Sequence, residues 1–363
     1  MRSQNESRYN SPMTSQAPSL SIVIPALDEA ETLPLLLQDL AKQENIYIET
    51  IVVDGGSKDN TRDICDNSPY KQTINLKILS TRQGRAHQMN EGVKICATTD
   101  YLFLHADTRI KNSRLLSNAQ RFIINTREQG RALNVAGHFP IKFDSKQATE
   151  KYYFYESKTH LNRPDCINGD QGFWISKAYF EQLGGYDESL PYMEDARLAL
   201  KIFETGHWVT LPGEIETSAR RFELEGFSQR QILNSFLCNF NAMGVSQFFQ
   251  SALDAYKSQN ETEKLKLKPF LKLAHQQMNG DGFTTAIKRW YLTGAYIVKN
   301  SWQLAFLLDC KRNRKQGYPP GSQNTRRLDF FDQHIAPATE WPIIKALTAI
   351  LTIFWFYSLF LTQ

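Results

Sequence analysis

Short apolar runs alternate with helical patterns along the first hundred residues. Four such runs, rich in Ile, Val, Leu and Phe, are each followed by turn-forming or polar residues: 20–24, 49–53, 76–79 and 101–105. The segments between them carry apolar residues at helical spacing or helix N-caps: 29–43, 57–67 and 85–97. Strands that are apolar on both faces are typical of a parallel sheet covered by helices on both sides. The pattern therefore predicts an open α/β sheet.

The C-terminal third has a different pattern. Residues 226–310 carry apolar side chains at helical spacing, which predicts a helical extension. Such helices either pack on the preceding domain or present an amphipathic surface to a membrane or to a hydrophobic acceptor. Residues 311–340 are basic and contain Pro319 and Pro320, so we expect a linker there.

A hydrophobic segment, 341–361, follows the expected linker. Its last 19 residues, from Ile343, carry one charged side chain, Lys345. A helix of that length spans roughly 28 Å, about the thickness of a bilayer core. We expect a membrane anchor, with the basic residues before it keeping the preceding domain cytoplasmic. The alternative is a C-terminal helix buried in the protein.

Composition and charge narrow the class of protein. The 363 residues are 41% hydrophobic and 22% charged, with a mean hydropathy of −0.44, which excludes a disordered chain and a polytopic membrane protein. A net charge of +4 gives no reason to expect nucleic acid as a partner. Five widely spaced cysteines without a CxxC pair indicate reduced thiols in the cytosol. Residues 1–18 are polar and lack an apolar stretch, so we expect a disordered tail and no secretory signal.

Charged side chains follow each predicted strand. In open α/β sheets, ligands bind outside the carboxyl ends of the strands, so these residues are candidates for a site. They are Asp28, Glu29, Asp54, Arg82, Arg85, His105 and Asp107. A carboxylate together with substrate phosphates is a common site for Mg²⁺ or Mn²⁺, and guanidinium groups pair with phosphate. We expect His105 and Asp107 to face one side, since residues two apart on a strand do so.

Two polar motifs lie further along the chain. The turn Asn168-Gly169-Asp170-Gln171-Gly172 precedes an apolar run, and Met193-Glu194-Asp195 precedes a helical pattern. Two acids at a helix start are explained by N-terminal capping, or one of them acts as a general base with a pKa raised by its neighbour. Spacing alone leaves both interpretations open.

Taken in series, these motifs resemble those of the inverting family 2 glycosyltransferases with a GT-A fold. The matching segments are SIVIPALDEAETLPLLL, IVVDGGSKDNT, a strand ending HAD, GDQGFWISKAYFEQLGGYDE and MEDARLALKI. HADT and the SARR stretch at 218–221 also resemble the subgroup called radical-SAM/selenodomain-associated transferase 2. The resemblance covers residues 19–240. It implies a GT-A-like catalytic domain at 19–225 with a mixed, mostly parallel nucleotide-binding sheet flanked by helices.

The resemblance also implies how a nucleotide-sugar donor would bind. Asp28 and Asp54 would surround the base and ribose, and Arg85 would lie beside the nucleotide or diphosphate. Asp107 would bind Mg²⁺ or Mn²⁺ as the second acid of the family's DxD motif. His105 replaces the first acid; imidazole is a poorer ligand for Mg²⁺ but suits Mn²⁺, and in related enzymes this position more often contacts the ribose.

The implied reaction is a single displacement that inverts the anomeric carbon. Asp195 matches the acid that removes the proton of the acceptor hydroxyl, and the turn at 169–172 would help form the pocket for the donor sugar and acceptor. Metal on Asp107, with Arg82 or Arg85, would stabilise the leaving diphosphate. The acceptor is left open, with a lipid-linked hydroxyl as one candidate.

Two other functions use similar residues. A nucleotide-binding regulator without turnover needs the same acids at the strand ends but has no use for Asp195. A sugar nucleotidyltransferase also needs metal, but we would expect a glycine-rich, lysine-bearing loop after the first strand, and residues 26–29 contain neither residue. Release of nucleoside diphosphate, of pyrophosphate, or of neither separates the three.

Overall fold

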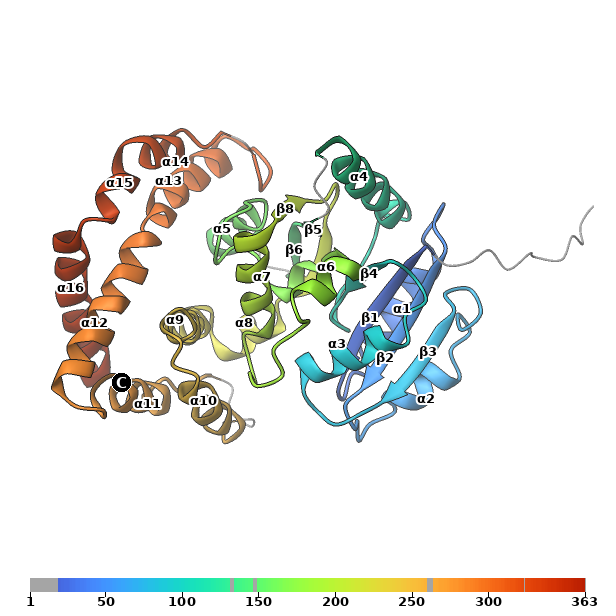
Figure 1. The fold of residues 1–363 in the computed structure, drawn as a ribbon, viewed down its shortest axis with the longest axis horizontal. Helices are drawn as coiled ribbons and strands as arrows, with labels where there is room; N and C mark the ends of the chain where they lie inside the picture. Colours follow the sequence, from blue (N-terminus) through green and yellow to red (C-terminus); the bar gives the residue numbers. More distant parts are fainter. Residues whose placement is uncertain (1–18, 131–133, 146–148, 260–263, 323, 363) are drawn as a thin grey trace, which may run out of the picture.

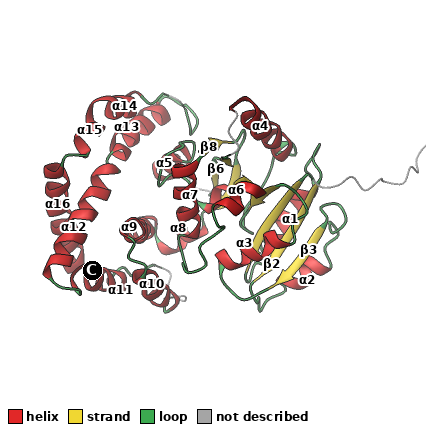
Figure 2. Ribbon diagram, in the orientation of Figure 1, coloured by secondary structure: helices red, strands yellow, loops and turns green. Residues whose placement is uncertain are grey.

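The computed structural model describes residues 19–130, 134–145, 149–259, 264–322 and 324–362. The tail expected at residues 1–18 lies outside the described residues. Strands gather in one half of the molecule, and the other half is built of helices (Figure 2). This division follows the change of pattern in the sequence, from short apolar runs to helical spacing.

A seven-stranded sheet forms the core of the N-terminal half (Figure 1). Its strands are β1 (Leu20–Ala26), β2 (Ile48–Asp54), β3 (Leu76–Ser80), β4 (Asp100–Phe103), β5 (Val135–His138), β7 (Phe173–Ser176) and β8 (His207–Thr210). Their order is β3-β2-β1-β4-β7-β5-β8, and β3, β2, β1 and β4 are parallel. The carboxyl ends of these four strands therefore meet at one edge. β7 runs antiparallel to β4 and β5.

Helices cover both faces of this sheet, and a small second sheet lies beside it. The helices of this half are α1 (Leu33–Ala41), α2 (Thr61–Asp66), α3 (Arg85–Lys94), α4 (Leu115–Gly130), α5 (Glu150–Lys158), α6 (Lys177–Gln182), α7 (Glu194–Thr205) and α8 (Arg220–Glu225), with a 3-10 turn at Gly169–Gln171. The second sheet pairs β6 (Ile141–Asp144) in parallel with β9 (Ile215–Ser218).

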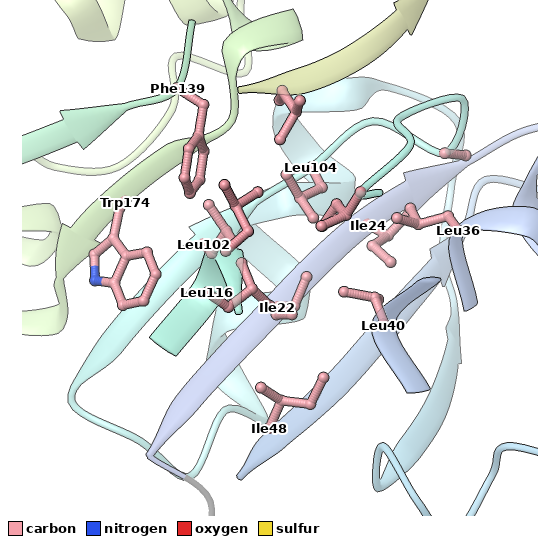
Figure 3. Close-up of a cluster of buried hydrophobic side chains, with 14 of the residues drawn as sticks. Ile22, Ile24, Leu36, Leu40, Ile48, Leu102, Leu104, Leu116, Phe139 and Trp174 are labelled. Atoms are coloured by element: carbon pink, nitrogen blue, oxygen red, sulfur yellow. The ribbon is translucent and has the colours of Figure 1, made fainter. Parts of the chain in front are cut away.

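Successive side chains of β1 enter two different cores because they point to opposite faces of the sheet. Ile22 and Ile24 pack in the cluster that includes Leu36 of α1 and Leu116 of α4 (Figure 3). Val23 lies between them in sequence but packs in the cluster on the other face. Both faces of the strand are buried, as its uninterrupted apolar run predicts.

The C-terminal half is helical. Its elements are α9 (Phe227–Met243), α10 (Gln247–Lys257), α11 (Lys268–Asn279), α12 (Phe283–Lys299), α13 (Trp302–Lys315), α14 (Arg326–Phe330), a π-helical turn (Phe331–Ile335), α15 (Ala336–Thr339) and α16 (Pro342–Thr362). The predicted fold class is confirmed: a mixed, mostly parallel sheet flanked by helices, with a helical C-terminal extension.

The segment expected to be a basic linker, 311–340, is largely helical. α13 continues to Lys315, and α14 begins at Arg326. Asp309 is buried and accepts hydrogen bonds from the backbone N–H groups of Arg327 and Leu328 at 2.9 Å each. A carboxylate at a helix start satisfies free backbone donors, so this contact fixes α14 against α13.

α16 is long and apolar enough to cross a membrane by length and composition, and it is the one such helix in the described part of the chain. Its mean hydropathy is 1.8, and 11% of its most apolar window is buried. One side packs against α12, where a Cβ added to Gly294 would lie 2.4 Å from the carbonyl oxygen of Lys345. The other side exposes Leu351 and Phe354, each 69% accessible.

Candidate active site

The loops after β1 and β2 are tied together by the predicted acids. The Oδ1 atom of Asp28 accepts a 2.7 Å hydrogen bond from the backbone N–H of Lys58, and the N–H of Asp28 donates to Oγ of Ser57 at 2.9 Å. Asp54 ends β2, and its Oδ1 accepts from the N–H of Ser57 at 3.0 Å. The Oδ2 atom of Asp54 is buried and has no hydrogen-bond partner among the described residues. A buried carboxylate oxygen without a donor is uncommon, so this position is a candidate for contact with a ligand.

The two candidate arginines point to different places. Arg82 is 63% exposed at its side chain and pairs with Glu188 at 2.8 Å, away from the other predicted acids. Arg85 begins α3 and pairs with Glu194 at 3.4 Å. The structure therefore brings Arg85, and not Arg82, to the acids of the Met193-Glu194-Asp195 motif.

His105 and Asp107 lie in the turn after β4, because that strand ends at Phe103. The N–H of Thr108 donates to the carbonyl oxygen of His105 at 3.1 Å, which closes the turn. The expectation that the two residues face one side because they share a strand is therefore wrong. They still interact, since the charge of Asp107 raises the pKa of His105.

His105 forms an ion pair with Asp170 of the 3-10 turn, with 2.8 Å between Nδ1 and Oδ1. Burial and the charge of Arg85 oppose protonation of His105, but the Asp170 carboxylate outweighs them and raises its pKa above the ordinary value. Burial likewise opposes ionisation of Asp170, but the hydrogen bond and charge of His105 hold its pKa well below the usual range. Each member of the pair thus favours the charged form of the other.

Asp195 meets the same turn from the start of α7. Its Oδ2 accepts a 2.6 Å hydrogen bond from the N–H of Gly169, and its Oδ1 accepts from the N–H of Ala196 at 2.7 Å. A Cβ on Gly169 would lie 2.9 Å from Nε2 of His105 and 3.1 Å from Oδ2 of Asp195. The close approach of the three residues therefore requires glycine at position 169.

Glu194 is the acid of the adjacent pair whose pKa is raised. Burial is the main cause, and the charge of Asp195 adds to it against the opposing charge of Arg85. The Glu194 side chain is 3% exposed, and the Arg85 guanidinium is its ion-pair partner. Glu194 therefore positions Arg85, whereas Asp195 accepts hydrogen bonds from the backbone. The two adjacent acids thus have different surroundings.

Two further charged residues, Glu29 and Arg221, belong to this group. Burial raises the pKa of Glu29, and the charges of Asp107, Arg221 and His105 also act on it. Arg221 in turn lowers the pKa of Asp170. Glu29 follows a predicted strand, and Arg221 lies in the SARR stretch, so a signal for both was present in the sequence.

Gln171 supports the turn from inside. Its side chain is fully buried and donates a 2.6 Å hydrogen bond to the carbonyl oxygen of Cys166. This differs from the expected contact with the donor, because the amide faces the protein interior.

The carboxyl edge of the sheet thus holds an acid–base cluster, defined here as Glu29, Arg85, His105, Asp107, Asp170, Glu194, Asp195 and Arg221. Burial opposes the charge of Arg85, but four acids of the cluster (Glu194, Asp195, Asp170 and Asp107) raise its pKa. Charges that act on one guanidinium lie near one another, so distant motifs meet at one place.

A divalent metal fits this cluster only with help from a substrate. Within the described ranges there is no group of three or more His, Cys, Asp or Glu side chains that could hold a metal ion. Asp107 offers one carboxylate, and Mg²⁺ commonly binds through one or two carboxylates and substrate phosphates. A metal here would take its remaining ligands from a diphosphate and water.

Comparison with known protein families agrees with this architecture. Residues 21–184, just under half of the chain, match the family described as glycosyl transferase family 2. This segment includes the turn at Gly169–Gln171 and ends before Asp195. This part of the chain is thus similar to the domain of family 2 glycosyltransferases.

Several curated relatives carry the name of a glycosyltransferase or of a biosynthesis protein. A PGL/p-HBAD biosynthesis glycosyltransferase of Mycobacterium bovis is 36% identical over 110 residues, which are 30% of this chain and 42% of the relative. The succinoglycan biosynthesis protein ExoA of Rhizobium meliloti is 25% identical over 203 residues, 52% of this chain and 60% of the relative. The chain thus spans about half the length of these relatives.

Solved structures with a similar outline include two complexes with nucleotide ligands. The mannosyltransferase PcManGT from Pyrobaculum calidifontis, in complex with GDP-Man and Mn²⁺, covers 94% of this chain and 88% of its own, with 16% identity and a TM-score of 0.48. S. aureus TarS in complex with UDP covers 87% and 91%, with 17% identity and a TM-score of 0.47.

Proposed function

We propose that this protein is an inverting glycosyltransferase that moves a sugar from a nucleotide-diphosphate-sugar donor to an acceptor hydroxyl. One observation carries the proposal. Residues from three distant motifs, His105, Gly169 and Asp195, are in contact at the carboxyl edge of a sheet within or next to the segment that matches family 2. A regulator that only binds nucleotide gives no reason for this contact.

The donor would bind along the ends of β1, β2 and β4. The free Oδ2 of Asp54 can accept a hydrogen bond from the base or ribose, and Asp28 holds the neighbouring loop. Arg85 supplies a positive charge for the diphosphate, since guanidinium pairs well with phosphate. His105 and Asp170, held to each other at 2.8 Å, would lie next to the transferred sugar.

Asp195 would be the general base. Its two oxygens accept hydrogen bonds from the N–H groups of Gly169 and Ala196, which fix the direction of the side chain. The base takes the proton of the acceptor hydroxyl as that oxygen attacks the anomeric carbon. The bond to the diphosphate breaks on the opposite side, so the configuration inverts.

Mg²⁺ or Mn²⁺ would be held by Asp107 together with the donor diphosphate. When bound, such a metal supplies positive charge to the leaving group. Arg85 and Arg221 supply positive charge to the same region from the protein itself. Nδ1 of His105 is paired with the carboxylate of Asp170. We therefore assign the metal to the carboxylate of Asp107.

We further propose that the catalytic half lies in the cytoplasm on a membrane surface. The apolar helix α16 and the basic residues that precede it support this location. Nucleotide sugars are available in that compartment. The acceptor then approaches from water or from the lipid phase.

The proposed base is tested by Asp195→Asn. We expect transfer to fall by about 10²–10⁴-fold, the usual contribution of a general base. Donor affinity should stay within a few-fold, because the amide keeps the shape of the side chain. Nucleoside diphosphate release with a panel of sugar donors measures the rate, and calorimetry measures donor binding.

Glu204→Gln is the matched control, since Glu204 lies exposed on the same helix. Full turnover in Asp195→Asn would remove the base role. Pyrophosphate as the released product would instead establish a nucleotidyltransferase, and donor binding without release would establish a regulator.

The proposed metal site is tested by Asp107→Asn. We expect Mn²⁺ to tighten donor binding in the unchanged protein and to have little effect in the variant, because a carboxylate ligand is lost. Donor titrations with Mn²⁺ and with EDTA measure the difference. Asp63→Asn, on the exposed side of α2, should behave as the unchanged protein. Equal donor affinity of the unchanged protein in Mn²⁺ and EDTA would contradict the assignment.

A further inference from the structure

A cavity of about 600 Å³ lies between the two halves of the molecule. Its walls come from α5 and the loop after it, from α9, and from α12, α13 and α16 of the helical half. Figure 1 shows α9 between α7, the helix that begins at Glu194, and α12, and residues of α9 form part of the cavity wall. Its volume is typical of a site for a small molecule.

Aromatic and apolar side chains form most of the cavity wall. Those from α9, α12 and α16 are Phe236, Phe240, Trp290, Tyr296, Trp355 and Phe356. Sites for small molecules are commonly lined by apolar and aromatic side chains with a few polar groups among them. The chemistry of the wall therefore favours a hydrocarbon chain over a sugar or a nucleotide.

Among the polar groups of the wall, several interact with Asp165 or lie beside it in the lining. Its Oδ2 accepts a 3.1 Å hydrogen bond from the side-chain amide of Asn300, and the Tyr296 hydroxyl interacts with it as well. Lys158, also in the wall, donates to Gln303 at 3.4 Å. One part of the cavity thus suits a polar head, while the remainder suits a chain.

This polar part adjoins the acid–base cluster. Asp165 has a left-handed backbone with φ of 63° and lies four residues before Gly169. Cys238 of α9 lines the cavity, and the charge of Asp195 contributes to the raised pKa of its thiol. Cavity and cluster therefore share a loop and lie within electrostatic reach of each other.

The apolar part of the cavity adjoins the exposed face of α16. Trp355 and Phe356 of this helix line the cavity, whereas Leu351 and Phe354 point outward and are 69% accessible. A molecule that partitions into an apolar surface would thus meet the cavity wall on the same helix.

We propose that this cavity binds the hydrocarbon chain of an amphipathic acceptor and so places its hydroxyl beside Asp195. The inference rests on the proposed function and names its acceptor class, a lipid alcohol or a lipid-linked sugar. The hydrocarbon chain would fill the apolar part of the cavity. The polar wall near Asp165 would receive the head group that joins the hydrocarbon chain to the hydroxyl.

Binding of the fluorescent fatty acid 11-(dansylamino)undecanoic acid to the full-length protein in detergent-free buffer tests the proposal. Unlabelled linear alcohols of increasing length should displace it, with affinity rising roughly fourfold per added methylene until the cavity is full. Geranylgeraniol and 1-hexadecanol as competitors distinguish a prenyl from an acyl chain.

Cys238→Phe fills the cavity from α9, and we expect probe affinity to fall at least tenfold. Ser235→Trp, at an exposed position of the same wall, should do the same with less risk to folding. Ala242→Trp adds the same bulk on an exposed position of α9 outside the wall and is the matched control. Nucleoside diphosphate binding should be equal in all four proteins.

Three results would overturn the proposal. The first is that the probe does not bind the unchanged protein. The second is that Cys238→Phe and Ser235→Trp bind the probe as tightly as the unchanged protein does. The third is that Leu351→Glu alone abolishes probe binding, which would place the probe on the outer face of α16. Failure of the proposed function looks different, because the probe would still bind in the cavity while no sugar donor is turned over.

Discussion

Gly169 is the residue on which the geometry of the acid–base cluster depends most directly. Its N–H donates to Asp195, and its missing side chain leaves room for the imidazole of His105. Any larger residue must displace one of these two groups or move the turn itself. The glycine is thus required by space and not by an unusual backbone angle.

We expect Gly169→Ala to lower kcat by about 10²-fold, because displacement of a reacting group by one ångström has effects of that size. Donor affinity should change much less, since Asp28, Asp54 and Arg85 are untouched. Steady-state kinetics with calorimetry separates the two. Gly184→Ala is the control: its φ of 77° makes alanine strained, but a Cβ there has no neighbour within 4 Å. An equal loss of kcat in both variants would contradict the argument.

Single residues differ in how far the sequence predicts their role. Asp54, Asp107 and Asp195 follow strands or begin a helix, so their position at the sheet edge follows from the chain pattern alone. Arg82 and Arg85 are three positions apart, and the sequence could not separate them. Their directions depend on where α3 begins, which is set by packing against the sheet.

Helices and strands could be predicted from the sequence where their pattern of apolar residues is long and uninterrupted. The first four strands, with the helices between them, follow the predicted order. β1, β2 and β4 are buried on both faces, whereas β3 is half-buried at the edge of the sheet. The strands from β5 to β9 have four residues each. Runs that short carry little periodic signal, and the antiparallel direction of β7 comes from pairing with distant strands.

Helix formation in the basic segment also depends on contacts far along the chain. Leu328 and Phe331 are buried in the same core as Trp302. Their burial outweighs the turn signals of the two prolines, which lie in the loop before α14. Local composition predicted a linker because it does not show which apolar residues meet a partner.

At the level of elements, the pair α12 and α16 is held at short distance by Gly294. Alanine there would gain about 1 kcal/mol of helix propensity but would overpack the contact at a cost of about 1–3 kcal/mol or more. We expect Gly294→Ala to lower the free energy of unfolding, because the clash involves backbone atoms at 2.4 and 2.5 Å. Thermal and denaturant unfolding measure the change.

Thr284→Ala provides the comparison for this prediction. It makes a similar gain in helix propensity at an exposed position of α12. It should be neutral or slightly stabilising. If Gly294→Ala instead raised the free energy of unfolding, α12 and α16 would be able to move apart without a loss of stability, and the prediction would be wrong.

The whole molecule has a polar and an apolar end. The acid–base cluster lies at the edge of the sheet, and the exposed face of α16 lies at the far side of the helical half (Figure 1). α16 also contributes Phe356 to the core of that half, so it is both a packed helix and an apolar surface.

We expect the double variant Leu351→Glu, Phe354→Glu to lose membrane association while it keeps its fold. Each charge at the centre of a membrane helix costs about 2.5–3.5 kcal/mol, whereas both side chains are exposed in the protein. Flotation with vesicles of neutral and anionic lipid measures association. Leu35→Glu, an exposed position of α1, is the control. A full-length protein that stays unbound to vesicles would contradict the membrane proposal.

In the proposed donor site, the Oδ2 atom of Asp54, which has no hydrogen-bond partner among the described residues, would set a filter on what the protein accepts. A molecule that offers it an N–H or O–H relieves a dehydrated lone pair, whereas one that presents another lone pair is repelled. Sites with a buried polar group reject analogues that lack its complement by roughly 10⁴–10⁵-fold. Discrimination between otherwise similar nucleotides would then reside in a single atom at the end of β2, remote from the bond that is broken.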